Sequence, residues 1–477
     1  MSDEISLRKS SGRAIIPVLL VAAFVVILNE TTMNVALTAI MADMHVTERT
    51  AQWLTTAFML TMAVVIPVTG WLLDRLTTRQ VFMIAMTAFS VGTLLCAIAP
   101  GFGFLLFGRV VQASGTAIMM PLLMTTIMQI IPPENRGGVM GNISMVIAVA
   151  PAVGPTLSGL ILHFGSWRLI FVVVLPIALL MLFLGGRYLE NVGEPKRTPL
   201  DLISIPLSVI AFAPLIYGLS LIGAENVEFW VPMLAIGIGV GGLVAFLARQ
   251  LVLQGRDRAF LDLRTFTHSS FTVSLTMLAI AMMAMFGSII MLPLLLQKAY
   301  GMEALQVGLM MLPGGILMGL LSPVVGRIFD RAGPRVLVIP ASVLVLGVFL
   351  FFSTMNPATP WWAVMIAHMV MSASFACIFT PLFTVALGSL PSNLYSHGSA
   401  VIGAVQQVAG AAGTALFVTV FAMQTAAARP AVASDAAAML AGAHWAFLGA
   451  GAIWTAAMFC GFFVRRPENA VQAGAAH

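Results

Sequence analysis

Runs of about 20 apolar residues recur along the whole chain and are separated by short polar stretches. A helix of this length rises 1.5 Å per residue and crosses a hydrocarbon core of ~30 Å. The pattern therefore predicts fourteen transmembrane helices, near residues 15–38, 52–73, 80–98, 104–129, 137–162, 168–187, 200–222, 229–250, 268–296, 303–325, 335–353, 360–388, 399–424 and 443–464.

The composition excludes a soluble globular protein. Of 477 residues, 60% are hydrophobic and 9% are charged, with a mean hydropathy of +1.01, whereas about a quarter of the residues of soluble domains are charged. We therefore expect an all-α polytopic membrane protein. The net charge of +5 does not indicate a nucleic-acid partner, because the basic residues form no dense patch. Cys96, Cys377 and Cys460 lie in apolar segments without motif spacing, so no disulfide framework, metal site or cofactor is expected.

The distribution of basic residues predicts the orientation. Eighteen of the 23 Lys and Arg residues lie on the side of the N-terminus, four lie on the other side, and Arg109 lies within a helix. Because cytoplasmic loops carry the excess of Lys and Arg, both termini are predicted to be cytoplasmic in a multi-pass protein of a bacterial inner (plasma) membrane. The first apolar segment is too long for a signal peptide and is expected to be retained.

A loop motif of one glycine, one aspartate and two arginines occurs twice with identical spacing. The copies are Gly70, Asp74, Arg75 and Arg79 after the second apolar segment, and Gly326, Asp330, Arg331 and Arg335 after the tenth. Both copies lie on the same side of the membrane in the predicted topology, which indicates that the two halves have the same orientation. We therefore expect six-helix bundles at 1–190 and 265–477, with two inserted helices and linkers at 191–264.

The two loops are candidates for a conformational latch. Asp74 and Asp330 lie at helix ends, where a carboxylate can accept hydrogen bonds from the N-terminal amides of a neighbouring helix and pair with arginines. Such contacts would break when the halves rock apart. The alternative is that the loops only anchor the helices at the membrane surface, but their duplication in register favours the latch.

Two further motifs lie within predicted helices. They are Leu105, Arg109, Gln112, Ser114 and Gly115 in the fourth, and Pro151, Gly154, Pro155, Ser158 and Gly159 in the fifth. The duplicated loop resembles the signature loop of the major facilitator superfamily, the fourth-helix motif is similar to that superfamily's, and the fifth-helix motif resembles that of its antiporters. The resemblance covers nearly the whole chain and implies two six-helix bundles plus two inserted helices, as in the fourteen-helix drug:proton antiporters.

Glu30 is the only acidic residue deep within an apolar segment. A charge within the membrane costs a few kcal/mol, so such a residue usually marks an ion or substrate path. At 1.5 Å per residue, Glu30 and Arg109 both lie ~8 Å below the outer edge. We therefore predict that Glu30 carries a proton and is linked to Arg109, directly or through water. The alternative is a structural ion pair. The family usually has an aspartate where this chain has Asn29, one residue or about 100° of helix rotation away.

Several polar or adaptable side chains in the predicted helices are candidates for substrate binding: Asn34, Gln112, Asn142, Phe286, Gln406 and Gln407. Amides suit a substrate with few charges, although they equally suit hydrogen bonds between helices. Phe286 follows a methionine cluster that could form an adaptable apolar pocket, with lipid-facing filler as the alternative. His368 could carry a second proton, but a single histidine in a bundle is more often neutral and hydrogen-bonded.

Two predicted helices carry stripes of small residues at steps of three and four. The stripes are Gly141, Ser144, Ala148, Ala152, Pro155 and Gly159, and Gly308, Gly315, Gly319, Ser322 and Gly326. Small residues allow helices to approach closely in a membrane. The resemblance implies that these two helices meet between the halves; the alternative is packing within one half.

These patterns together predict a proton-coupled antiporter that exports hydrophobic or amphipathic compounds, including cationic ones, by alternating access. We expect a monomer in contact with membrane lipids, and a periplasmic adaptor is compatible with this type of exporter. The alternative within the same fold is a lipid or metabolite exporter or flippase. A membrane enzyme or sensor is disfavoured, because no catalytic cluster, nucleophile elbow, phosphate loop or output domain is present in the sequence.

Overall fold

The computed structural model describes residues 2–192, 199–222, 227–256, 258–431 and 434–465. These residues form fourteen α-helices and four short 3-10 helices, and no strand occurs among them. All fourteen α-helices are long and apolar enough to span a membrane. The predicted helix number and the all-helical class are therefore confirmed.

The helices follow the predicted order along the chain. The N-terminal ones are α1 (Ser2–Met44), α2 (Glu48–Arg75), α3 (Thr78–Ala97), α4 (Phe102–Ile130), η1 (Pro133–Asn135), α5 (Arg136–Phe164) and α6 (Arg168–Tyr188), followed by α7 (Ser204–Leu221), α8 (Trp230–Gln254) and η2 (Leu263–Thr267). The C-terminal ones are α9 (Ser269–Lys298), α10 (Ala304–Ala332), α11 (Arg335–Ser353), α12 (Trp361–Gly388), η3 (Ser392–Leu394), α13 (Tyr395–Ala428), η4 (Arg429–Ala431) and α14 (Asp435–Gly461).

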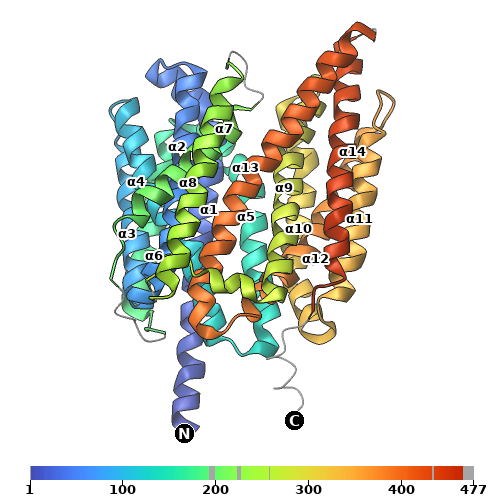
Figure 1. Cartoon of the computed structure of the whole chain (residues 1–477). Coiled ribbons are helices and arrows are strands. Elements are labelled where there is room, and N and C mark those ends of the chain that lie inside the picture. The colour runs from blue at the N-terminus through green and yellow to red at the C-terminus, as the bar shows by residue number, and fades with distance from the viewer. Residues whose placement is uncertain (1, 193–198, 223–226, 257, 432–433, 466–477) are drawn as a thin grey trace.

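The largest differences from the sequence prediction lie at helix ends. α1 begins at Ser2 rather than near residue 15 and projects beyond the other helices (Figure 1), because its polar N-terminal stretch is rich in helix formers such as Glu, Leu, Arg and Lys. α14 begins at Asp435 rather than near residue 443. The hydroxyl of Ser434 accepts a hydrogen bond from the Ala437 N–H at 3.2 Å and caps this helix.

The helices form two groups joined by an inserted pair (Figure 1). α1–α6, the N-group, pack mainly on one another, and so do α9–α14, the C-group. The inserted helices α7 and α8 pack together, and α7 also contacts α2 and α13, so it lies at the junction of the groups. We call the end of the molecule where α1 begins and α14 ends the proximal end, and the opposite end the distal end.

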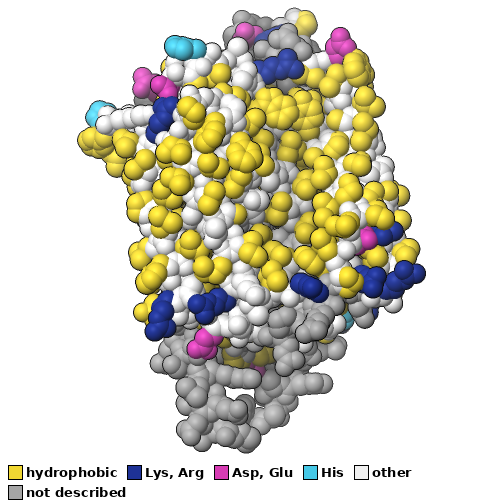
Figure 2. Space-filling model, turned by 90° about the vertical axis from the view of Figure 1, so that its left-hand side faces the viewer, with side chains coloured by type: hydrophobic (Ala, Val, Ile, Leu, Met, Phe, Trp, Pro, Cys, Tyr) yellow, Lys and Arg dark blue, Asp and Glu magenta, His cyan; other side chains and the backbone are white. Residues whose placement is uncertain are grey.

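The surface has the composition of a lipid-facing protein. Figure 2 shows apolar side chains over the middle of one face, with Lys and Arg at both ends and more of them near the proximal end. Large apolar side chains are exposed, for example Phe183 of α6 at 68% and Leu320 of α10 at 65%. Such exposure is stable only where hydrocarbon replaces water, which agrees with fourteen membrane spans.

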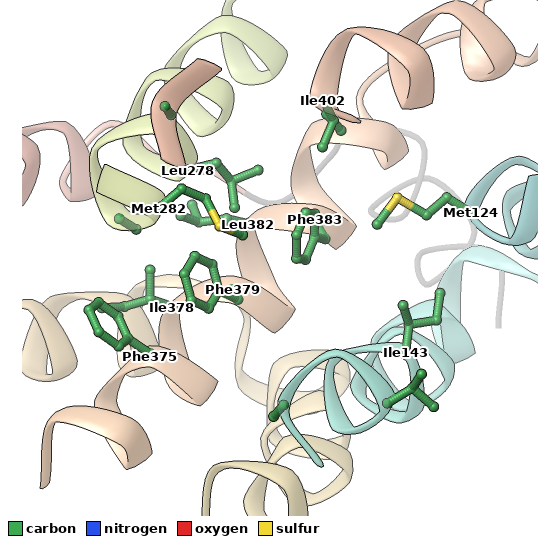
Figure 3. Packing of buried hydrophobic residues seen from close by; sticks show 14 of the residues in the cluster. Met124, Ile143, Leu278, Met282, Phe375, Ile378, Phe379, Leu382, Phe383 and Ile402 are labelled. Atoms are coloured by element: carbon green, nitrogen blue, oxygen red, sulfur yellow. The ribbon is translucent and has the colours of Figure 1, made fainter. Parts of the chain in front are cut away.

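The buried core continues from one group to the other. Phe375, Phe379 and Phe383 on α12 stack one turn apart, with ring centroids 5.5 and 6.2 Å apart (Figure 3). Met124 of α4 and Ile143 of α5 extend towards α12 from the N-group in the same view and belong to the same apolar cluster. One buried apolar cluster therefore extends across both groups in this state.

Candidate functional site

Arg109 is buried within the N-group and is 1% exposed. Its Nη1 donates hydrogen bonds to Gln112 Oε1 at 2.6 Å and to Asn29 Oδ1 at 3.4 Å. The guanidinium lies 4.0 Å from the ring centroid of Phe58, and Gln112 Nε2 donates to Thr93 Oγ1 at 2.7 Å. Arg109 therefore connects α4 directly to α1 and α2, and through Gln112 to α3.

Glu30 lies next to this network and is half-buried. Arg109 is close enough to interact electrostatically with Glu30, but among the described residues the two form no hydrogen bond or ion pair. The predicted direct link is thus absent from this state, while a link through water stays a prediction. The physical reason is the rotation of about 100° per residue, because Asn29, one position earlier, is the residue of α1 that contacts Arg109.

Two donors beside Glu30 are unsatisfied. Asn29 Nδ2 and Arg109 Nε are buried and have no hydrogen-bond partner within the described part of the chain. A buried donor without a partner costs about 1–3 kcal/mol. A small shift of α1 against α4 that brought a carboxylate to these donors would recover that cost.

The fifth-helix motif has two faces. A Cβ added to Gly154 would lie 3.0 Å from the Cβ of Thr31, and Ser158 Oγ donates to the Thr32 carbonyl at 2.9 Å. These two residues hold α5 against α1 immediately after Glu30. Pro151, Pro155 and Gly159 are exposed, and a Cβ added to Gly159 would meet no atom within 4 Å.

The two motif aspartates lie where the groups meet at the proximal end. Asp330 at the end of α10 accepts hydrogen bonds from the backbone N–H groups of Gly137 and Gly138, both at 2.8 Å, in the first turn of α5. Asp74 at the end of α2 accepts a hydrogen bond from Ser396 Oγ in the first turn of α13. Both aspartates thus contact a helix N-terminus of the other group, Asp330 through backbone amides and Asp74 through a side-chain hydroxyl. Their role as a latch stays a prediction.

Two of the motif arginines contact the last helix of their own group. Arg79 donates to the Gly186 carbonyl of α6, and Arg335 donates to the Phe462 and Val464 carbonyls after α14, at 2.9 and 3.2 Å. Each therefore holds the last helix of its own group, where a cation also favours the negative helix terminus. Arg75 and Arg331 are exposed.

The motif glycines mark close approaches. A Cβ added to Gly70 would lie 2.5 Å from the Phe260 carbonyl oxygen, and one added to Gly326 would lie 2.7 Å from the carbonyl carbon of Gly137. Backbone therefore approaches backbone at both sites, and a larger side chain would force the groups apart.

The small-residue stripes of α5 and α10 meet, as predicted. A Cβ added to Gly141 would lie 2.8 Å from Pro323 Cα, and one added to Gly315 would lie 2.6 Å from Ala152 Cβ. The contact does not extend to the distal end, because Cβ atoms added to Gly159 and Gly308 would meet nothing within 4 Å. The groups are therefore held together along the proximal part of these helices.

The candidates for substrate binding are not one cluster. Gln112 is fully buried in the Arg109 network, so it positions Arg109 in this state. Asn142, Gln406 and Gln407 are half-buried, and Phe286 is 37% exposed and faces Gly410 of α13. The side chain of Asn34 lies outside the described residues. His368 is 6% exposed, and its Nδ1 has no hydrogen-bond partner within the described residues.

Sequence reasoning missed several residues of these contacts. Phe58 and Thr93 are an aromatic and a hydroxyl residue of ordinary type in apolar helices, so only the fold shows that they support Arg109. Ser396 and His397 precede the predicted start of their helix near residue 399. The duplicated loop could have indicated Ser396 and His397, because a carboxylate at the position of Asp74 needs hydrogen-bond donors, and a polar helix N-terminus in the other half can provide them.

Comparison with known proteins agrees with this architecture. A sequence model of the Major Facilitator Superfamily matches residues 19–414. The lincomycin resistance protein LmrB of Bacillus subtilis is 38% identical over 94% of this chain and 95% of its own length. The MFS-type transporter YcnB of the same organism is 36% identical over 98% of both chains. The multidrug export protein EmrB of Haemophilus influenzae is 29% identical over 83% of this chain and 78% of its own.

Solved structures show the same fold at low sequence identity. The human organic anion transporter MFSD10 superposes with a TM-score of 0.69 at 14% identity, over 94% of this chain and 99% of that one. The proton:xylose symporter XylE gives 0.63 at 14% identity, over 98% and 99%. With its fourteen spans, its duplicated loop motif and these relatives, the chain belongs to the major facilitator superfamily, in its fourteen-helix branch, and is a membrane transporter rather than an enzyme.

Proposed function

We propose that this transporter exports hydrophobic and amphipathic compounds, including cationic ones, in exchange for protons. The observation that carries the proposal is Glu30, a carboxyl group within membrane-spanning α1 that lies beside buried Arg109 and two unsatisfied donors. An ionisable group at such a place is costly and is expected to serve ion movement. The similarity to LmrB, a lincomycin resistance protein, and to EmrB, a multidrug export protein, supports a drug-like substrate.

The geometry suggests how protonation acts on the helices. A charged Glu30 is attracted to Arg109 and to the free donor of Asn29, whereas a neutral Glu30 tolerates an apolar environment. Thr31, the next residue, packs on Gly154 of α5. A shift of α1 would therefore reach α5 and its contact with α10. In this mechanism Glu30 carries the proton and Arg109 stabilises its charged form.

The loop motifs, the α5–α10 contact and the polar side chains within the helices are assigned to gating and substrate binding. The paired loops and the α5–α10 contact form the gate that holds the proximal end closed. The half-buried Asn142, Gln406 and Gln407 bind the substrate together with Asn34 and the exposed Phe286. Gln112 positions Arg109 instead. The proximal end faces the cytoplasm of the bacterial cell, because it carries most Lys and Arg residues.

Everted membrane vesicles test the function. A cationic dye, lincomycin or a labelled lipid is added to energised vesicles, and proton release is followed by a fluorescent pH indicator. Glu30→Gln is expected to reduce dye-driven proton release by at least about tenfold, because a carboxamide does not bind and release a proton near neutral pH. The exposed residue Glu190 provides the matched control, and Glu190→Gln should behave as the wild type.

Two results would contradict the proposal. Undiminished proton release by Glu30→Gln, at equal amounts of protein in the membrane, would remove Glu30 from the coupling. Proton release driven by the lipid and not by the dye or lincomycin would instead favour a lipid exporter of the same fold.

A further inference from the structure

His397 lies where three segments meet at the proximal end. It occupies the first turn of α13 in the C-group and is 7% exposed. Its Nε2 lies 3.5 Å from Asp74 Oδ2 of α2 in the N-group. Its Nδ1 lies 3.1 Å from the carbonyl oxygen of Phe260, in the segment 258–262 that follows the inserted pair.

Both ring nitrogens of His397 face oxygen atoms that only accept. A backbone carbonyl has no proton to donate, and an ionised carboxylate has none either. A neutral imidazole has one N–H and can satisfy one of the two oxygens, whereas the imidazolium ion donates to both. We propose that His397 is a proton-binding site distinct from Glu30, and that its protonated form locks the proximal end closed.

The other charged groups around His397 favour the same ion. Asp262, 4% exposed, lies in the segment 258–262 and interacts electrostatically with His397. Burial opposes ionisation of Asp262, but hydrogen bonds from Arg264 and the charge of His397 hold the pKa of this carboxyl below its ordinary value. Asp262 and Asp74 are therefore two carboxylates from different segments that face the imidazole.

The basic residues nearby are engaged elsewhere. Arg264 hydrogen-bonds to Asp262. Arg136 donates to the carbonyls of Met128 and Ile131 and lies 5.6 Å from the ring centroid of Tyr395. Arg75 is exposed.

The segment 258–262 is firmly seated in this junction. Phe260 is fully buried, with its ring centroid 6.2 Å from that of Trp71 on α2, and Phe260 and Leu261 donate their N–H groups to Gln250 Oε1 of α8. The segment that follows the inserted pair thus supplies the third partner of this contact, the carbonyl oxygen of Phe260. When α2 and α13 separate, His397 loses at least one of its two acceptors.

Linkage fixes the direction of the effect. The imidazolium ion can donate to both acceptors only where α2, α13 and the segment 258–262 meet, so acid favours the closed proximal end. A neutral imidazole leaves one of the two oxygens without a donor, so this stabilisation is absent at higher pH. This inference rests on the proposed movement of the two groups and on a cytoplasmic proximal end. It implies that acidification of the cytoplasm slows an exporter that would bring in more protons.

Distance measurements between spin labels test the lock. Tyr188→Cys on α6 and Val336→Cys on α11 place labels on exposed proximal positions of the two groups, in full-length protein whose three native cysteines are replaced by alanine. In lipid nanodiscs, the ratio of closed to open molecules should fall between pH 5.5 and 8. One linked proton changes this ratio by up to about tenfold per pH unit.

Variants assign the pH dependence. His397→Gln should remove it, and His397→Asn, which keeps a donor near Nδ1, serves as a second variant if the first does not fold. The exposed residue His163 gives the matched control, and His163→Gln should leave the pH dependence unchanged. A wild type without pH dependence, or a His397 variant that retains it, would overturn the inference. The two tests are independent. If the vesicle assay showed no proton coupling, the proposed function would be contradicted, whereas the pH dependence of the distance between the spin labels could still be present.

Discussion

At the scale of single residues, two neighbouring residues of α1 share the interaction with Arg109: one contacts the guanidinium and the next carries the negative charge. Asn29 contacts Arg109, and Glu30 supplies the negative charge about 100° further around α1. The amide satisfies part of the guanidinium without neutralising it. Glu30 is half-buried and forms no ion pair among the described residues, which agrees with the proposed gain and loss of a proton.

Arg109→Lys tests the shape of this network. A lysine keeps the charge but loses the planar group that lies over Phe58 and donates to Gln112 and Asn29. We expect transport in everted vesicles to fall by at least about tenfold, since hydrogen bonds of charged groups contribute about 1.5–3 kcal/mol. The exposed residue Arg429 gives the control Arg429→Lys. Wild-type transport by Arg109→Lys would show that charge alone is needed.

At the scale of elements, the two copies of the duplicated loop contact the opposite group through different kinds of hydrogen-bond donor. Asp330 binds backbone N–H groups of Gly137 and Gly138, whereas Asp74 binds the side chains of Ser396 and His397. The loops also turn differently. Gly333 after α10 has φ +82°, a left-handed conformation that favours glycine, while Thr77 is extended and caps α3 with Gln80.

The inserted pair has its own ion pair at the proximal end. Arg249 of α8 donates to Asp201 at 2.7 and 3.1 Å, just before α7 begins. Hydrogen bonds from Arg249, partly offset by burial, hold the pKa of Asp201 below its ordinary value of 3.8. Because the folded pKa is lowered, the stabilisation is complete above pH ~4 and is lost as the pH falls through the folded value.

Asp201→Asn should therefore lower the free energy of unfolding by about 1 kcal/mol at pH 7. The difference from the wild type should shrink as the pH falls below the ordinary carboxyl pKa of 3.8 and through the lower folded value. Tryptophan fluorescence during thermal unfolding in detergent measures it. Asp435→Asn removes an exposed ion pair, with side chains 58% and 74% exposed, and should have little effect. An equal effect of both substitutions would contradict a specific role of Asp201.

At the scale of the whole molecule, the N-group and the C-group meet near the proximal end. The contacts of Asp330 and Asp74 and the small-residue stripes of α5 and α10 join them there. The hydroxyl oxygens of Thr125 on α4 and Ser399 on α13 are also 2.8 Å apart. Towards the distal end, Gly159 and Gly308 have no close neighbour. The described contacts therefore define a state closed at the proximal end.

Gly141→Ala tests whether this contact gates transport. A Cβ at Gly141 would lie 2.8 Å from Pro323 Cα and closer still to the Ser322 carbonyl, so α5 and α10 would have to separate. We expect fewer closed molecules in the spin-label experiment and about tenfold slower transport, because small residues set the approach of membrane helices. Gly159→Ala, on the same helix but in open space, is the matched control. Equal behaviour of the two variants would show that the contact does not control the gate.

The sequence by itself predicted most of the architecture. Fourteen spans follow from the length of the apolar runs, because hydrocarbon requires each helix to satisfy its own backbone. The repeat followed from the matching spacing of Asp74 and Asp330, and the meeting of α5 and α10 from their small residues and the family resemblance. The domain boundaries near residues 190 and 264 stay a prediction.

Only the tertiary structure decided which side chains meet. Residue spacing gave Glu30 and Arg109 equal depth but not the rotation of α1 that brings Asn29 to the arginine. It also gave no indication that Phe260 and Asp74, which are far apart in sequence, both face the imidazole of His397. The physical reason is that depth in a membrane depends on length along one helix, whereas contact depends on how several helices turn and pack against one another.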